Sequence, residues 1–221
     1  MMALLLAAGC SSKSQSDTPA PDSGAAEEAS TVDAGEDADD TGTGCVYPSG
    51  PYGITVDKVL DPSLTWQGYL PNATTASTIN IADLYDCTGT KGINAILIDT
   101  AGQWCIACQG VAQEIPTWLS ASGDNYTGLG VKILNLIIQN NAYEPATITT
   151  ADQWRTQWAL SMIYVTADPN ITFPTDSLPN EILVDPRTMK VSRLLSADND
   201  QQNNDGSDPY VAELAKKNGG K

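Results

Sequence analysis

The sequence predicts an α/β domain in which helices flank a central mixed β-sheet. Residues 93–99 and 130–138 are nearly continuous apolar runs, as expected of strands buried on both faces. Each run is followed by a segment in which apolar residues recur at helical spacing. Two further strand patterns and a last helical pattern follow, which completes the order strand, helix, strand, helix, hairpin, helix.

Residues 1–9 look like the end of a secretory signal peptide. The apolar run 3–8 is far shorter than the roughly 20 residues of a spanning helix. Residues 6–10, Leu-Ala-Ala-Gly-Cys, resemble the lipobox of bacterial lipoproteins, although Ala7 stands where leucine is more usual and no basic residue precedes the run. The resemblance implies that Cys10 is lipidated and anchors the protein to a membrane of the bacterial cell envelope, facing the periplasm. An ordinary cysteine after a short apolar start is the alternative.

Residues 10–44 predict a disordered acidic tether that begins at the lipidated cysteine. They are mostly small, polar and acidic, so they cannot bury enough apolar surface to offset the entropy of ordering. The whole chain carries 27 acidic against 11 basic residues, a formal charge of -16, which argues against nucleic-acid binding. Histidine is absent, so catalysis by Ser-His-Asp or Cys-His groups is excluded.

Residues 45–221 predict one globular domain, which opens with short strands between turn signals. Residues 54–56 and 64–66 are strand candidates in a segment rich in proline, glycine and tyrosine. Residues 79–81 suggest another brief strand, and 81–85 a helical turn.

The segment 106–120 predicts an amphipathic helix that starts at a pair of cysteines, and Pro116 is expected to kink or interrupt it. A second helix is predicted at 150–160. Residues 162–166 could extend that helix or form a short strand.

The C-terminal part predicts a hairpin and a closing helix. Residues 181–185 and 190–195 have strand patterns, and the turn 186–189 joins them. Residues 208–217 predict the last helix.

Cys105 and Cys108 lie where a buried strand passes into a helix N-terminus. Free backbone N–H groups and the positive end of the helix dipole favour a thiolate there. The two-residue separation allows one sulfur to attack a substrate disulfide and the other to resolve the mixed disulfide.

Residues 96–108, which run from this strand through Trp104 to the dithiol, resemble the thioredoxin-like superfamily. The resemblance implies a thioredoxin fold. It implies that Cys105 is the exposed nucleophile and Cys108 the resolving cysteine, and that Trp104 shapes the substrate-binding surface. Asp99 stands six residues before Cys105, where thioredoxins carry a buried carboxylate that takes protons from the resolving cysteine; the alternative is that Asp99 only ends the strand.

The resemblance extends over roughly residues 53–217 and is nearest to the redoxin and TlpA-like branch. Pro179, just before the predicted hairpin, occupies the place of the family's cis-proline, and Leu178 would offer backbone groups to an extended substrate. The segment 54–86 resembles the N-terminal β-hairpin extension of that branch.

Two departures from related patterns limit the resemblance. In the TlpA-like branch an acidic residue and a proline follow the second cysteine by three and five positions, whereas Glu114 and Pro116 come six and eight positions later. Peroxiredoxins carry a threonine or serine three residues before their reactive cysteine and a proline four residues before that. Gly102 and Ile98 occupy these two positions here, so peroxidase activity is a minority alternative.

Cys45 and Cys87 are predicted to form a structural disulfide, because they flank the N-terminal hairpin and the expected compartment is oxidising. A zinc site made of the four cysteines 45, 87, 105 and 108 is the alternative, but the spacing of paired zinc ligands is missing. No metal or other cofactor is expected.

The predicted function is a thiol-disulfide oxidoreductase that reduces exported proteins, with protein thiols or disulfides and an upstream electron donor as partners. The direction of electron flow stays open. A lipid-anchored binding domain, in which the disulfide of Cys105 and Cys108 is permanent and structural, is the alternative from another class.

Overall fold

The structure, a computed structural model, describes residues 44–196 and 209–221. The predictions for the signal peptide, for the lipidation of Cys10 and for nearly all of the tether lie outside these residues. Within the described ranges, no helix combines the length and the apolar character needed to cross a membrane.

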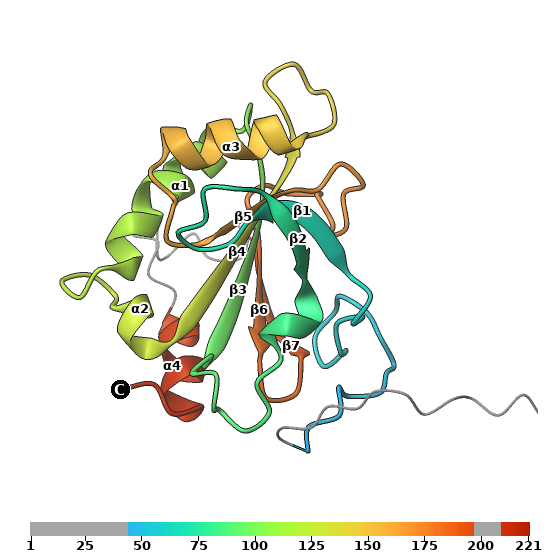
Figure 1. The fold of residues 1–221 in the computed structure, drawn as a ribbon, viewed down its shortest axis with the longest axis vertical. Helices are drawn as coiled ribbons and strands as arrows, with labels where there is room; N and C mark the ends of the chain where they lie inside the picture. Colours follow the sequence, from blue (N-terminus) through green and yellow to red (C-terminus); the bar gives the residue numbers. More distant parts are fainter. Residues whose placement is uncertain (1–43, 197–208) are drawn as a thin grey trace, which may run out of the picture. The chain divides into compact units, whose positions relative to one another are not determined.

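The described residues form one mixed sheet of seven strands in the order β2-β1-β5-β4-β3-β6-β7 (Figure 1). Neighbours β3 and β4, and β4 and β5, are parallel, whereas the other neighbouring strands are antiparallel. The strands are β1 (Thr65–Tyr69), β2 (Ser77–Asn80), β3 (Ala95–Gly102), β4 (Val131–Gln139), β5 (Tyr164–Ala167), β6 (Asn180–Asp185) and β7 (Lys190–Ser196). This arrangement confirms the predicted thioredoxin fold, with β1 and β2 as its N-terminal hairpin extension.

The two faces of the sheet are covered differently. The helices are η1 (Ile81–Leu84), α1 (Ile106–Leu119), α2 (Tyr126–Leu129), α3 (Ile148–Gln157) and α4 (Pro209–Lys217). Buried residues of α1 to α4 all belong to one core cluster, and these helices lie together on one side of the sheet (Figure 1). The opposite face is covered by η1, by the segment 47–64 and by Phe173.

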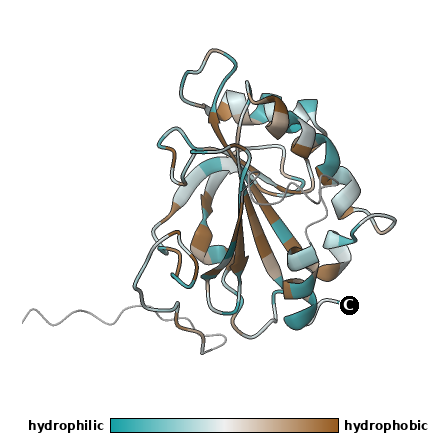
Figure 2. Ribbon diagram, turned by 180° about the vertical axis from the view of Figure 1, so that it is seen from behind, coloured by the Kyte–Doolittle hydropathy of each residue, from teal (hydrophilic) through white to brown (hydrophobic). Residues whose placement is uncertain are grey.

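Strand β3 lies at the centre of both clusters because its side chains alternate between the faces. Ala95, Leu97 and Ala101 pack in the cluster of the α-helices, whereas Ile96 and Ile98 pack in the opposite one. The central strands β3 and β4 are largely hydrophobic, as are the brown strands in the middle of Figure 2, which is the pattern of strands buried on both faces.

One predicted strand is wrong. Residues 54–57 form bends and a turn, in which the N–H of Lys58 donates to the carbonyl oxygen of Thr55 over 3.0 Å. Asp57 has a positive φ of 67°, which an extended strand does not allow. This short run therefore contributes to the core without pairing as a strand. Ile54 packs against the core cluster on the face opposite the α-helices.

The structure also decides two points about the helices that the sequence left open. Helix α1 is not interrupted at Pro116 and ends three residues later, at Leu119. Because the proline lies in the last turn and is exposed, the helix loses one backbone hydrogen bond and little else. The segment after α3 is strand β5, not an extension of the helix, since it pairs with both β1 and β4.

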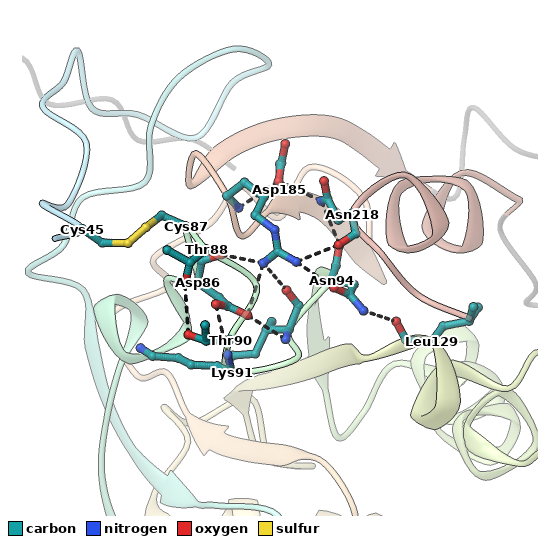
Figure 3. Close-up of polar contacts among 12 residues, drawn as sticks. Cys45, Asp86, Cys87, Thr88, Thr90, Lys91, Asn94, Leu129, Asp185 and Asn218 are labelled. Carbon is teal, nitrogen blue, oxygen red and sulfur yellow. Dashed lines mark hydrogen bonds and ion pairs between the residues drawn. A yellow bond between two sulfur atoms is a disulfide. The ribbon is translucent and has the colours of Figure 1, made fainter. Parts of the chain in front are cut away.

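A cluster of polar contacts around Arg187 holds three parts of the chain together near the N-terminal end of strand β3. Its guanidinium donates hydrogen bonds to the carbonyl oxygens of Asp86, Ile93 and Asn218 and to the side-chain oxygen of Asn94, the last two over 2.8 Å each. It also forms an ion pair with the carboxylate of Asp86 over 3.2 Å. Figure 3 shows Asp86, Asn94 and Asn218 converging on this point. The N-terminal extension, the turn between β6 and β7 and the end of α4 are thus joined by one side chain.

The carboxylate of Asp86 is strongly bound in this Arg187 cluster. Burial opposes its ionisation, but the N–H groups of Ile93 and Lys91 and the charge of Arg187 outweigh burial and lower the pKa of Asp86.

Replacing Arg187 with methionine should lower the free energy of unfolding by about 3 kcal/mol, because the buried carboxylate of Asp86 and several carbonyl groups lose their donor. Urea unfolding followed by circular dichroism measures the change. Arg155→Met is the matched control, since Arg155 pairs with the exposed Asp152 at 2.9 Å and should cost less. Equal losses in the two variants would contradict a special role for the Arg187 cluster.

Candidate active site

Cys105 and Cys108 are joined by a disulfide where β3 passes into α1. Their Cα atoms are 5.2 Å apart, which one helical turn provides. Cys105 is the N-cap residue of α1, and its sulfur accepts a hydrogen bond from the N–H of Cys108 over 3.1 Å. In the reduced protein, the same N–H group and the helix dipole would favour the thiolate of Cys105 over that of Cys108.

The expectation of an exposed nucleophile is wrong for this disulfide form. Cys105 is only 6 % exposed and Cys108 is fully buried. Ile106, between them in sequence, is 82 % exposed and is the residue that faces solvent. A substrate must therefore approach a narrow edge of Cys105 beside an apolar side chain.

Asp99 lies on the same side of the sheet as the dithiol. Its neighbours along β3 on that face, Leu97 and Ala101, pack in one cluster with Cys105 and Cys108. Side chains two residues apart on a strand share a face, so the carboxyl of Asp99 points to the α1 side. The structure thus brings Asp99 and the dithiol to one face.

The carboxyl of Asp99 is held by a short hydrogen-bond chain that the sequence did not reveal. Asn135, its register partner on β4, donates to the carboxyl Oδ2 over 2.7 Å and accepts from the indole N–H of Trp154 over 2.7 Å. Asp99 is 1 % exposed, and its Oδ1 has no hydrogen-bond partner among the described residues. Burial raises the pKa of Asp99 to about 7, so this carboxyl can exchange a proton near neutral pH.

Trp104 is covered by a residue that sequence reasoning missed. The ring of Tyr143 stacks on Trp104 with centroids 5.0 Å apart, and Tyr143 is 63 % exposed. The indole N–H of Trp104 donates to Gln139 over 3.0 Å, and Gln139 in turn donates to the carbonyl oxygen of Tyr143 over 3.0 Å. Tyr143 and Ile106 therefore add apolar surface beside the dithiol.

The loop that presents Tyr143 is closed by Asn140. The side-chain oxygen of Asn140 accepts from the N–H groups of Ala142 and Glu144 over 2.8 and 3.0 Å. Tyr143 has a positive φ of 62°, uncommon outside glycine, and this loop geometry imposes it. An Asn-rich loop predicts a turn, but nothing in its sequence shows that Tyr143 meets Trp104.

The Leu178–Pro179 peptide bond is cis and directly precedes β6. Pro179 is buried, and Leu178 packs against the cluster that contains both cysteines of the disulfide. Trp104 packs against the same cluster. The three residues expected to contact substrate thus gather around one core region with the dithiol.

The second disulfide joins Cys45 to Cys87 and lies near the Arg187 cluster (Figure 3). Cys87 follows Asp86, whose carboxylate accepts a hydrogen bond from the N–H of Ile93 just before β3 begins. The dithiol, in contrast, follows the end of β3. The two disulfides therefore lie near opposite ends of β3. With both pairs bonded, no cysteine thiolate of residues 44–196 or 209–221 remains for the zinc alternative, and these residues contain no cluster of three potential metal ligands.

Comparisons with known proteins extend the description of the fold. No protein-family model matches the sequence, and no curated protein is similar to it in sequence. An uncharacterized conserved protein from Geobacillus kaustophilus has a similar structure, with TM-score 0.53, 11 % identity and coverage of 76 % of this chain and 86 % of that one. A hypothetical protein from Sinorhizobium meliloti is similar with TM-score 0.51 and 12 % identity, over 77 % of this chain and 89 % of that one.

A thiol:disulfide interchange protein from a Bacteroides species also matches, with TM-score 0.46, 12 % identity and coverage of 70 % of this chain and 88 % of that one. At such identities the two higher-scoring likenesses concern the fold alone. The assignment of chemistry therefore rests on the site itself.

Proposed function

We propose that this protein is a thiol-disulfide oxidoreductase that acts through Cys105 and Cys108. The observation that carries the proposal is a disulfide at the N-terminus of a 14-residue helix, with a buried carboxyl of raised pKa on the same face of the sheet. A helix N-terminus stabilises a thiolate, and a carboxyl with a pKa near the working pH can move the proton of the second thiol.

The reaction balances in two steps. The thiolate of Cys105 attacks a substrate disulfide, which forms a mixed disulfide and releases one substrate thiolate. The thiol proton of Cys108 passes to the carboxylate of Asp99, and the Cys108 thiolate then attacks the sulfur of Cys105. The second substrate thiolate leaves, and the protein dithiol has given up two electrons to the substrate and become a disulfide.

The surface for the substrate is built from Trp104, Leu178 and Pro179, and we add Tyr143 and Ile106. The exposed apolar area of the last two would receive a chain segment next to the substrate cysteine. As the family resemblance implies, Leu178 would offer its backbone groups to an extended segment. No metal or organic cofactor is needed for this exchange.

The cellular setting follows from the N-terminal residues. Lipid on Cys10 would hold the domain at a membrane of the cell envelope, facing the periplasm, with the tether as a spacer. Exported proteins with disulfides are the substrate class, and an upstream thiol-disulfide donor returns electrons to the dithiol. The structural disulfide of Cys45 and Cys87 suits that oxidising compartment.

The burial of both sulfurs favours one competing function: a binding domain with a permanent disulfide at this place. A redox titration of the chain carrying Cys10→Ser distinguishes the two, with thiol labelling read separately for each cysteine pair. A reversible two-electron transition of Cys105 and Cys108 near about -270 mV supports a reductase, and one near about -120 mV an oxidant. A pair that stays oxidised below about -300 mV and resists dithiol exchange supports the binding domain and overturns our proposal.

A further inference from the structure

Glu181 lies directly across from Asp99 in the ladder between β3 and β6. These strands are neighbours in the sheet (Figure 1), and the next pair on the same face is Leu97 with Leu183. Both leucines belong to the cluster that contains Cys105 and Cys108. Because residues two apart on a strand share a face, the carboxyls of Asp99 and Glu181 leave the sheet on the dithiol side. Directly opposed residues have Cβ atoms about 4.5–5.5 Å apart.

The two carboxyls differ in their access to water. Asp99 is fully buried, and its Oδ1 lacks a hydrogen-bond partner among the described residues, whereas Glu181 is partly exposed. The Oδ2 side of the Asp99 carboxyl is occupied by Asn135, which in turn accepts from Trp154. Glu181 is the titratable neighbour that reaches towards the surface.

One cationic residue is a near neighbour of this pair in the sheet. Arg193 on β7 stands opposite Leu183 and is thus a diagonal neighbour of Glu181 on the same face. Its guanidinium lies 3.3 Å from the ring centroid of Tyr210 on α4.

The described residues of the other elements on this face that lie next to the pair are neutral or belong to the dithiol. Asn135 on β4 and Trp154 on α3 are neutral, and α1 contributes the two cysteines. The charged residues of α1, α3 and α4 lie outside the buried cluster or pair with each other: Glu114, Asp152, Arg155, Glu213, Lys216 and Lys217.

We propose that Asp99 and Glu181 form a two-carboxyl proton relay behind the dithiol, in which Glu181 carries protons between buried Asp99 and water. The relay rests on the proposed function, because the proton is the one that Cys108 releases. Its thiol proton passes to the carboxylate of Asp99, then to the carboxylate of Glu181 and then to water, while the electron pair of the broken S–H bond stays on the sulfur. Glu181 acts through Asp99 and is a positioning residue.

The ionised Glu181 also disfavours ionisation of Asp99, because like charges repel at short range in a buried site. Glu181→Gln should therefore lower the midpoint of Asp99 titration by about one pH unit. Carbon-13 NMR of labelled aspartate carboxyls measures this midpoint without any substrate, with the Asp99 signal assigned through Asp99→Asn. Glu114→Gln is the matched control, since it makes the same change on the exposed side of α1.

The coupling must also be visible from the side of Glu181. Because Asp99 still holds its proton when Glu181 ionises, Asp99→Asn should leave the main titration midpoint of Glu181 in place and should remove the small second inflection that the Glu181 signal shows at the Asp99 midpoint. Glutamate labelling measures this inflection even if Glu181→Gln does not fold. In single-turnover exchange, Glu181→Gln should slow the proton-dependent second step by about tenfold and shift its pH profile towards acid, and Glu181→Asp should restore part of the rate.

An Asp99 midpoint that stays unchanged in Glu181→Gln, or a wild-type Glu181 signal without an inflection at the Asp99 midpoint, overturns the relay while a wild-type chain that exchanges disulfides keeps the proposed function. A wild-type chain without exchange overturns the proposed function and the relay together. A wild-type chain that exchanges, with the Asp99 midpoint lowered in Glu181→Gln and the Glu181 inflection lost in Asp99→Asn, supports the relay.

Discussion

Cys105→Ser should abolish disulfide exchange, lowering its rate by at least about a thousandfold, because the sulfur at the helix N-terminus is the attacking atom. Cys108→Ser should instead retain the first attack and accumulate a mixed disulfide through Cys105, since no second thiol resolves it. The hydrogen bond from the N–H of Cys108 to the sulfur of Cys105 is a backbone contact and survives the serine substitution. The two variants should therefore differ in what they trap.

Non-reducing electrophoresis after incubation with a model disulfide protein measures this difference, in chains that also carry Cys10→Ser. The double substitution of Cys45 and Cys87 by serine is the control for loss of a disulfide as such, and it should retain exchange wherever it remains folded. If Cys108→Ser traps nothing through Cys105, the reactive-cysteine assignment is contradicted. Equal trapping by both variants would contradict the distinct roles of the two sulfurs.

Asp99→Asn should make the oxidised protein more stable than the wild type, by an amount that increases with pH. The folded carboxyl keeps its proton up to a pKa of about 7, whereas the unfolded carboxyl ionises near its ordinary value of 3.8. Between these values the folded state binds more protons, so the free energy of unfolding of the wild type falls as the pH rises. The asparagine variant has no such titration at this position.

From pH 4 to pH 8 the stability difference between Asp99→Asn and the wild type should grow by on the order of 4 kcal/mol. A poorly paired amide hydrogen in Asp99→Asn would change the free energy of unfolding by the same amount at every pH. The pH dependence of the stability difference is therefore free of this contribution. Urea unfolding at several pH values measures it, and Asp176→Asn controls for the loss of one carboxylate at the surface. A difference that stays constant across this pH range would contradict the raised pKa of Asp99.

Much of the candidate site could be predicted because its signals are local. The apolar run before Trp104 and the helical spacing after Cys105 identify a buried strand followed by a helix. The dithiol must then lie at their junction. The observed boundaries differ from the predicted ones by a few residues. The strand predicted at 93–99, for example, is β3, which continues to Gly102.

The errors arose where short apolar runs had no partner that the sequence could indicate. Residues 54–56 are apolar enough for a strand, yet they form a turn and pack without pairing. The segment that became β5 was ambiguous for the same reason, and its pairing with both β1 and β4 decided the outcome. Strand pairing over such short runs depends on tertiary context more than on propensity.

The sequence by itself determined the α/β class, the order of the main elements and the place of the dithiol, because periodicity, turn residues and cysteine spacing act over a few neighbouring positions. Only the tertiary structure decided that Glu181 and Asn135 flank Asp99 and that Tyr143 covers Trp104. These contacts join residues far apart in the chain, and strand register and loop packing select them when the whole core forms.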